Sequence, residues 1–134
     1  MDARFERYIE NLRTVRTLSQ PKFSPDMKAK ELLETIQSNG KLVIALEGAW
    51  QPWSFHDESD TLVGYDVEVA TEIAKKLGVE PQFVEGEWDG LLAGLDAGRY
   101  DIMVNGVDIT PERAEKYDFS TPYAFNRTAV ITKA

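Results

Sequence analysis

The sequence predicts an α/β fold: a parallel β-sheet with helices on both faces, in three layers. From residue 41 onward, short apolar runs typical of strands alternate with segments whose apolar residues recur every three or four positions, as in helices. The run "KLVIAL" at 41–46 is nearly all apolar, which indicates a strand buried on both faces. Such strands belong to parallel sheets whose faces are covered by helices.

Two helices are predicted before this alternating region. Residues 3–18 have the pattern of an amphipathic helix, whose apolar face comprises Phe5, Tyr8, Ile9, Leu12, Val15 and Leu18. The segment 19–26 contains two prolines and interrupts it. A second helix begins with Ser24 as its cap and Pro25 at its first position, and ends at Asn39–Gly40. Its buried stripe comprises Leu32, Leu33 and Ile36.

The remaining elements follow from apolar periodicity and from glycines that end helices. The helix over 66–77 has an inward face of Val67, Ala70, Ile73, Ala74 and Leu77, and Leu91, Leu92 and Leu95 face inward from a helix over 88–97. Thr110 caps a short helix with Pro111 at its first position. Strands are predicted at 41–46, 80–86, 100–106 and 127–132.

Three loops leave the carboxyl ends of the predicted parallel strands, at 47–56, 85–90 and 105–113. Ligands of such sheets bind at these strand ends. We expect all three tryptophans to lie in these loops, none of them in the apolar stripe of a helix or in a strand. The side chains that could bind a ligand there are Trp50, Trp53, Phe55, Trp88, Asp108 and Arg113.

Arg113 has two interpretations that spacing leaves open. It falls in the first turn of the predicted short helix, where backbone N–H groups lack partners and a positive charge is disfavoured. A ligand carboxylate bound by the guanidinium and these amides would offset that cost. A surface ion pair with Glu112, Glu115 or Asp118 would do so equally well.

Asp108 also has two interpretations. Aspartate commonly accepts hydrogen bonds from nearby backbone in turns, but it could equally provide the counter-charge for an ammonium group. An acid and an arginine beside aromatic side chains match a zwitterion such as an α-amino acid. Trp50 and Trp88 would wall the pocket, while Trp53 and Phe55 could equally anchor their loop in the core.

Composition excludes several other functions. The net charge of −8 and the pI near 4.7 argue against nucleic acid as a partner. With no cysteine, the chain has no disulfide and no thiolate site. The single histidine, His56, has no partner at metal-ligand spacing and is expected to be an exposed loop residue. Ser54 and Ser120 lack a base, and no phosphate-binding glycine loop is present, so we expect no metal, cofactor or catalytic residue.

A family resemblance adds to this reading. The segments "PWSF", "GYDVEVA", "WDGLLAGLDAGRYD", "ITPER" and "YDFSTPY" occur in this order between residues 52 and 123. Together they resemble the first lobe of the extracytoplasmic amino-acid-binding proteins of ABC importers, over about residues 41–133. The similarity is nearest to the branch for cystine and polar amino acids. It implies a three-layer α/β/α lobe of the two-lobed periplasmic-binding-protein fold of type II.

The resemblance also implies roles for individual residues. Arg113 would clamp the α-carboxylate of the ligand. The backbone at Gly106 and the residue Asp108 would receive its α-ammonium group. Trp50 and Trp88 would sandwich its side chain.

Two positions leave the ligand class open. An acid at the place of Glu47 contacts the side chain of basic ligands in some members of the family, but it also occurs in members that bind other ligands. The family often has threonine or serine where this chain has Asp108. An acid at this position strengthens an ammonium site without naming the ligand.

We expect two segments: an N-terminal amphipathic helix and linker at 1–24, and the first lobe at 25–134. By resemblance, the lobe is truncated at the hinge strand and the second lobe is absent. Half of the ligand contacts would then be missing, and a loss of ~3–4 kcal/mol weakens binding by hundreds-fold. We hypothesise that the helix over 3–18 covers apolar surface that the absent part would cover.

The resemblance implies an extracytoplasmic location, periplasmic or lipid-anchored at the cell surface. The first ten residues are charged and lack the apolar region of a signal peptide, so a cytoplasmic location stays open. The expected partners are a free amino acid, the permease of an ABC transporter and a second copy of the chain in a homodimer. The alternatives to a binding protein are a dimerising sensor or interaction module without ligand binding, and an enzyme similar to cyclohexadienyl dehydratases.

Overall fold

The computed structural model describes residues 29–125 and 129–133. The helix predicted over 3–18, the linker after it and the predicted helix start at Ser24 and Pro25 lie outside these residues. The second predicted helix is present as α2 (Ala29–Asn39). In its stripe, Leu32 and Ile36 are buried and Leu33 is half-buried, as the pattern predicts.

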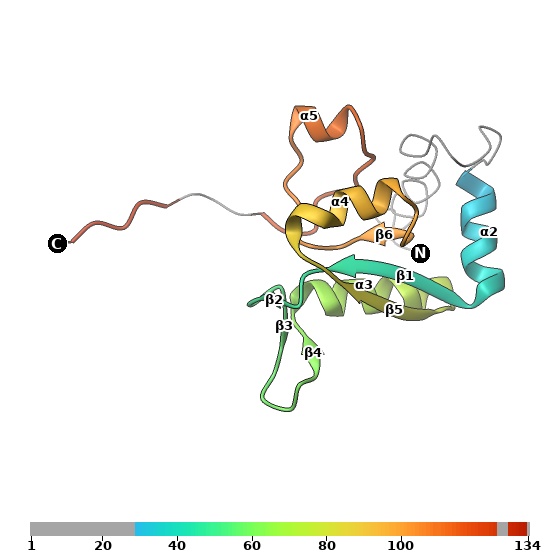
Figure 1. Ribbon diagram of the computed structural model, residues 1–134, viewed down its shortest axis with the longest axis horizontal. Helices are drawn as coiled ribbons and strands as arrows, with labels where there is room; N and C mark the ends of the chain where they lie inside the picture. Colours follow the sequence, from blue (N-terminus) through green and yellow to red (C-terminus); the bar gives the residue numbers. More distant parts are fainter. Residues whose placement is uncertain (1–28, 126–128, 134) are drawn as a thin grey trace.

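The central sheet has three parallel strands: β1 (Lys41–Leu46), β5 (Glu80–Glu85) and β6 (Ile102–Met103), with β1 in the middle (Figure 1). Lys41 lies opposite Glu80 and Leu46 opposite Glu85, so β1 and β5 pair over their full length. Only two residues of β6 pair with β1, fewer than the predicted strand over 100–106. Because all three strands run the same way, their carboxyl ends meet at one edge of the sheet.

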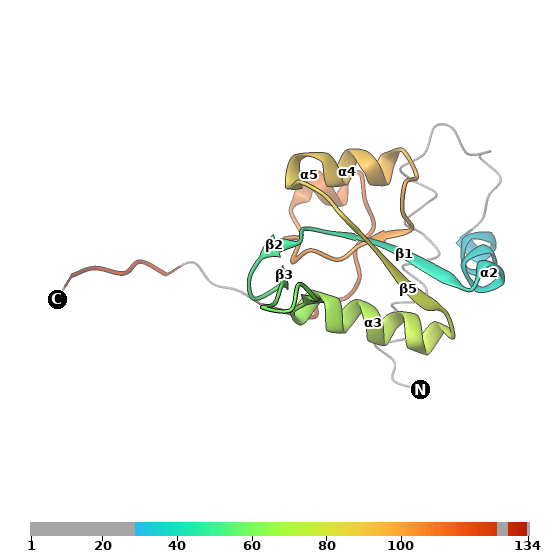
Figure 2. The ribbon, with the colours of Figure 1, turned by 60° about the horizontal axis from the view of Figure 1, so that its bottom comes forward.

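Helices cover both faces of this sheet, as Figure 2 shows. Successive β1 residues point to opposite faces: Leu42 and Ile44 belong to one buried cluster, and Ala45 belongs to the other. The first cluster joins the sheet to α2 and to α3 (Tyr65–Leu77), and the second joins it to α4 (Trp88–Asp96). The three-layer prediction is confirmed. The predicted inward residues of α3 are all buried: Val67, Ala70, Ile73, Ala74 and Leu77.

The predicted aromatic loop after β1 contains a small antiparallel sheet that the sequence analysis missed. It consists of β2 (Ala49–Trp50), β3 (Ser54–His56) and β4 (Leu62–Val63), and it projects away from the main sheet (Figure 1). Strands of two or three residues are too short to show alternation in a sequence. The expectation that no tryptophan lies in a strand is also wrong, because Trp50 is in β2. Trp88 begins α4, at the start of the helix predicted over 88–97.

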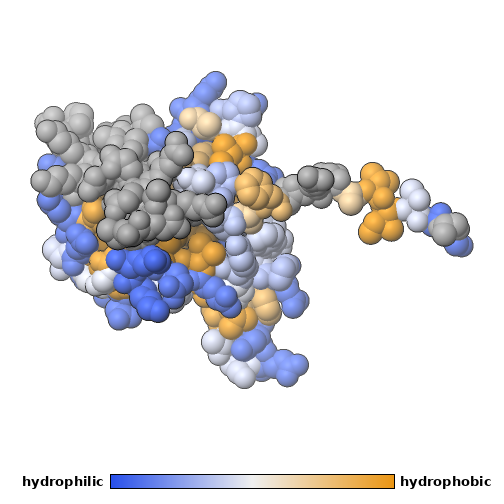
Figure 3. Space-filling view, turned by 180° about the vertical axis from the view of Figure 1, so that it is seen from behind, coloured by the Kyte–Doolittle hydropathy of each residue, from blue (hydrophilic) through white to orange (hydrophobic). Residues whose placement is uncertain are grey.

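The C-terminal region differs from the prediction as well. The short helix α5 (Pro111–Ala114) is present, with Thr110 as its cap. Residues 129–133 form no strand, although a strand was predicted over 127–132. They extend away from the body of the protein, where the structure shows no neighbouring strand to bond with (Figure 1). Val130 and Ile131 are therefore 86% and 95% exposed, and the segment is visible as an apolar patch on the tail in Figure 3.

Candidate functional site

The predicted site residues come from the segments that follow the three parallel strands. Glu47 directly follows β1, and Trp88 follows β5 after a two-residue connection. Gly106 and Asp108 follow β6, ahead of Arg113 in α5. The carboxyl edge of the sheet therefore brings together segments that are up to 66 positions apart in the sequence (113 − 47).

The segment that carries Trp50 is anchored to the start of α3. The first two helical N–H groups, of Tyr65 and Asp66, donate to the carbonyls of Pro52 and Trp53 at 3.1 and 2.9 Å. These groups have no partner inside a helix, so the loop supplies one. Gly64 permits the approach: its φ is +130°, and a Cβ at this position would lie 2.3 Å from the carbonyl oxygen of Trp53.

Trp50 packs on Gly106. A Cβ on Gly106 would lie 3.1 Å from Cη2 and Cζ3 of the indole, and the residue has a left-handed φ of +51°. Both features favour glycine at this position. The turn after β6 therefore lies directly against one of the two predicted aromatic walls, and Trp50 is still 38% exposed.

Arg113 contacts the loop that precedes it and the other predicted wall. Its Nη1 donates to the backbone carbonyl of Asp108 at 2.9 Å, and its guanidinium carbon lies 5.2 Å from the centre of the Trp88 ring. A cation over an indole face is attracted by the ring electrons. The backbone N–H of Arg113 is capped by Thr110 Oγ1 at 3.3 Å. These contacts hold the guanidinium in a defined place, and they explain the five-residue spacing between Asp108 and Arg113.

Glu47 is held by a residue that the sequence analysis did not select, Asn105. The amide Nδ2 of Asn105 donates to Glu47 Oε2 at 2.9 Å, and its Oδ1 accepts from the Glu47 backbone N–H at 2.8 Å. Asn105 is only 1% exposed. One buried amide thus joins the ends of β1 and β6 and fixes the direction of the Glu47 carboxylate.

Asp66 is a second polar residue that the analysis missed, because an acid in the first turn of a helix is ordinary capping chemistry. It is fully buried, and Oδ1 accepts from the Tyr123 hydroxyl at 2.9 Å. Burial raises the pKa of this carboxyl, while the Tyr123 hydroxyl and the Gly106 backbone N–H partly lower it. Among the described residues, Oδ2 has no partner with full hydrogen-bond geometry, although the Gly106 N–H is close enough to affect the pKa.

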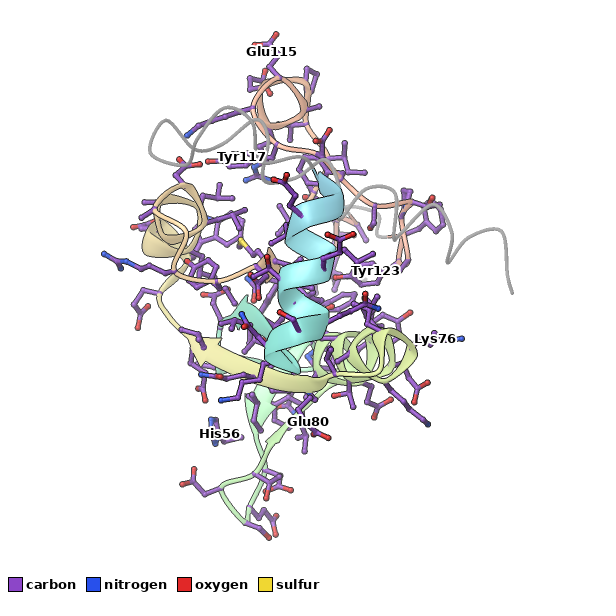
Figure 4. The ribbon with its side chains drawn as sticks, turned by 90° about the vertical axis from the view of Figure 1, so that its right-hand side faces the viewer. His56, Lys76, Glu80, Glu115, Tyr117 and Tyr123 are labelled. Atoms are coloured by element: carbon purple, nitrogen blue, oxygen red, sulfur yellow. The ribbon has the colours of Figure 1, made fainter. Side chains whose placement is uncertain are left out.

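A row of aromatic rings connects the site to the segment after α5. Trp50 and Trp53 have ring centres 5.9 Å apart, and Trp53 meets Tyr65 edge-on at 5.7 Å. Tyr65 then stacks on Tyr123 at 6.1 Å and donates its hydroxyl to the Tyr123 carbonyl at 3.1 Å. Figure 4 shows Tyr123 beside α3. Trp53 therefore belongs to this row, which favours its interpretation as a loop anchor.

A cavity of about 360 Å³ borders the site. Trp50, Trp53, Gly106 and Asp108 line it together with apolar residues of β6 and the 117–125 segment. Among the predicted residues, Glu47, Trp88 and Arg113 do not line it. The cavity therefore extends from the turn along β6.

His56 lies at the carboxyl end of β5, on the side opposite α5 (Figure 4). It is in β3 rather than in a loop, and its exposure was predicted correctly. Nε2 contacts the Glu85 carboxylate at 3.0 Å and Nδ1 contacts Asp60 at 3.1 Å, so acceptors on both sides raise the pKa of the ring. The part of the chain that the structure describes contains no group of three or more residues able to hold a metal ion.

Comparisons with known proteins find relatives of this chain. Residues 42–134 match the family described as bacterial extracellular solute-binding proteins, family 3. An L-cystine-binding protein of Bacillus subtilis, TcyA, is 44% identical over 107 residues, which are 79% of this chain and 40% of that protein. The chain spans 38–44% of the length of the first curated relatives that it matches.

Two solved structures show the same fold. A mutant of the arginine-bound form of domain 1 from TmArgBP is 40% identical with a TM-score of 0.67, covering 69% of this chain and 71% of that domain. The ancestral amino-acid-binding protein AncCDT-1, described as a precursor of cyclohexadienyl dehydratase, gives the same identity and TM-score. This match covers 69% of this chain but only 40% of AncCDT-1. No helix within the described ranges is long and apolar enough to cross a membrane.

Proposed function

Because this chain belongs to the bacterial extracellular solute-binding proteins of family 3, we propose that it forms the first lobe of an amino-acid-binding protein of an ABC importer. It holds a free polar amino acid, with cystine as the first candidate, outside the cytoplasm. In this proposal residues 25–134 form the lobe and residues 1–24 are a separate segment. The permease of the importer is its partner.

The observation that carries the proposal is the position of Arg113. Its guanidinium is held by a backbone carbonyl and an indole face. A guanidinium has five N–H donors, and the contact with Asp108 uses one of them. The remaining donors suit a bidentate bond to the α-carboxylate of the ligand.

The ammonium end of the ligand is assigned to the turn after β6. The side chain of Asp108 is exposed at the turn, and its carbonyl anchors Arg113. The backbone at Gly106 lies beside it. Opposite charges only a few residues apart suit the two ends of a zwitterion, which is the part common to all free α-amino acids.

The side chain of the ligand then lies between Trp50 and Trp88, with Glu47 at the strand end. Glu47 is half-buried and is oriented by Asn105 through Oε2. A carboxylate in this position favours ligands with a polar or cationic side chain over purely aliphatic ones. Cystine, which carries a second ammonium group, meets this requirement, and so does a basic amino acid.

The experiment is a titration of the protein with cystine, glutamine and arginine, followed by calorimetry and by backbone NMR shifts at millimolar ligand. One lobe supplies only part of the contacts, so we expect dissociation constants weakened by hundreds-fold for a loss of ~3–4 kcal/mol. The matched controls are the same amino acids with the carboxyl converted to an amide or with the amine removed.

We expect binding by the free amino acid, weaker binding by both blocked analogues, and shifts centred on residues 105–113. Failure of all three amino acids to bind, combined with a stable dimer in sedimentation, would favour an interaction module. Turnover of a cyclohexadienyl substrate would favour an enzyme.

A further inference from the structure

Asp66 is an unusual residue for its position in the fold. An acid in the first turn of a helix normally points to solvent, where water satisfies it and the helix dipole favours it. The neighbouring Glu68 on α3 does so and is exposed. Asp66, in contrast, has no exposed surface. Its carboxylate therefore depends on protein groups for the hydrogen bonds that water would have provided.

The contacts of Asp66, through its backbone and its carboxylate, come from three separate segments. The backbone N–H of Asp66 bonds to Trp53 in the loop before β3. Its Oδ1 accepts from the Tyr123 hydroxyl, and Oδ2 lies 3.8 Å from the place that a Cβ of Gly106 would occupy. The carboxylate thus sits directly behind the turn to which we assigned the ligand ammonium group, on the side away from solvent.

The arrangement has an energetic cost. Burial raises the pKa of Asp66, so the charged form is less stable in the folded protein than in water. The Tyr123 hydroxyl and the Gly106 N–H offset only part of this. A buried, incompletely satisfied carboxylate next to a binding turn is a costly feature, and such features are commonest at functional sites.

We propose that Asp66 is the positioning residue of the ammonium-binding turn: its buried carboxylate attracts the Gly106 N–H from behind and fixes the turn against Trp50. This inference rests on the proposed function for the identity of the ligand, but the positioning itself is a property of the protein alone. Asp66 does not contact the ligand. It acts through Gly106, and Tyr123 holds the carboxylate in place.

The geometry explains why the turn needs such support. Gly106 has a left-handed φ of +51°. Because glycine has no Cβ, its backbone can adopt many other conformations as readily as this one. An attraction between its N–H and a fixed carboxylate selects one conformation from these. The same negative charge behind the turn also favours a positive group in front of it, which is where the ammonium group would lie.

The test compares three variants. Asp66→Asn keeps the size of the side chain and removes its charge, and Tyr123→Phe keeps the ring that stacks on Tyr65 and removes the hydroxyl that holds the carboxylate. Glu68→Gln makes the same chemical change as Asp66→Asn on the exposed face of the same helix, two residues away, and is the matched control.

The first measurement needs no ligand. An amide proton that points to a carboxylate resonates downfield, and its shift follows the titration of that carboxylate. We expect the Gly106 amide to titrate with pH in the wild type and in Glu68→Gln. In Asp66→Asn it should lie upfield and should not titrate, and Tyr123→Phe should change its midpoint. A Gly106 amide that behaves alike in Asp66→Asn and Glu68→Gln would overturn the proposal.

The second measurement is the affinity for the amino acid that the wild type binds best. We expect a roughly tenfold weaker affinity in Asp66→Asn, the equivalent of one charge-assisted contact, with an unchanged or higher unfolding temperature. The analogue without the amine should lose much less. An unchanged affinity in Asp66→Asn would contradict the role in binding. If the wild type bound no amino acid, the proposed function would fail, while the Gly106 amide would still decide whether Asp66 positions the turn.

Discussion

Two sets of residues at the carboxyl edge of the sheet, an inner set and an outer set, differ in how they are held. The inner set, Asn105 and Asp66, is 1% and 0% exposed and is bonded to groups from distant strands and loops. The outer set, Trp88, Asp108 and Arg113, is half-buried or exposed, and its members contact one another through a carbonyl bond and a ring contact. We infer two different roles from this: the inner set shapes the candidate site, and, under the proposed function, the outer set supplies groups for a ligand.

This comparison makes opposite predictions for stability and for affinity. Loss of Asn105, in the inner set, leaves the groups that it bonds without partners, so it should reduce the free energy of unfolding. Loss of an outer residue exposes its partners to water, so it should leave folding nearly unchanged while binding is lost. Three changes test this, in order of expected effect.

The largest effect is expected from Arg113→Ala. Removal of the guanidinium would leave the ligand carboxylate unpaired, and we expect an affinity at least ~100-fold weaker, about 3 kcal/mol. The free energy of unfolding should change by no more than about 0.5 kcal/mol, because Arg113 lies at the surface. Calorimetric titration and urea unfolding measure the two quantities.

The matched control for this change is Arg99→Ala, which removes an exposed arginine just before β6, at the end of that strand away from the site. It should alter neither quantity. Equal losses of affinity in both variants would indicate that only the overall charge matters, and the outer set would then have no specific role.

A smaller effect, of the opposite kind, is expected from Asn105→Ala. The change breaks both hydrogen bonds with Glu47 and leaves the backbone N–H of this half-buried residue without its partner. We expect a loss of about 1–3 kcal/mol in the free energy of unfolding, measured with urea. Asp108→Asn, in the outer set, should cost less than about 0.5 kcal/mol. A smaller loss for Asn105→Ala than for Asp108→Asn would remove the distinction between the two sets.

The smallest effect is a pH dependence that Asp66 contributes. Its pKa in the folded protein is raised above the ordinary value of 3.8, so the folded state binds this proton more tightly than the unfolded state. Stability from this group is therefore greatest at low pH and falls as pH rises from about 3.8 through the raised pKa.

Thermal unfolding of the wild type and Asp66→Asn across pH 3–7 isolates this contribution, because other titrating groups such as Asp118 are common to both. We expect the stability difference to shift in favour of Asp66→Asn as pH rises. A shift in the other direction would mean that its hydrogen bonds outweigh the cost of burial. In that case the charged carboxylate of Asp66 would stabilise the folded protein.

The fold was largely predictable from the sequence because its main elements have strong local patterns. The five inward positions of α3, the apolar strand β1 and the stripe of α2 each repeat with the period of their element. The antiparallel sheet formed by β2, β3 and β4 was missed because its strands have two or three residues. The strand predicted over 127–132 is absent at 129–133. A strand requires a neighbouring strand to pair with, and the local sequence does not show whether one is present.

The candidate site divides in the same way. Trp50, Trp88, Asp108 and Arg113 stand out in the sequence because aromatic and charged residues after strand ends are conspicuous. Asn105 and Asp66 do not stand out, because an asparagine in a turn and an acid at a helix start are ordinary choices. Their importance lies in groups 58 and 57 positions away in the sequence.

The sequence by itself determined the α/β layering, the edge at which a ligand would bind, and the charged and aromatic groups available there. These follow from periodicity and from the common direction of parallel strands. Only the tertiary structure decided that Arg113 rests on the carbonyl of Asp108 and the ring of Trp88, that Asn105 orients Glu47, and that Asp66 lies buried behind Gly106. The physical reason is that burial and hydrogen bonding depend on which distant segments come into contact, and local residue patterns do not show those contacts.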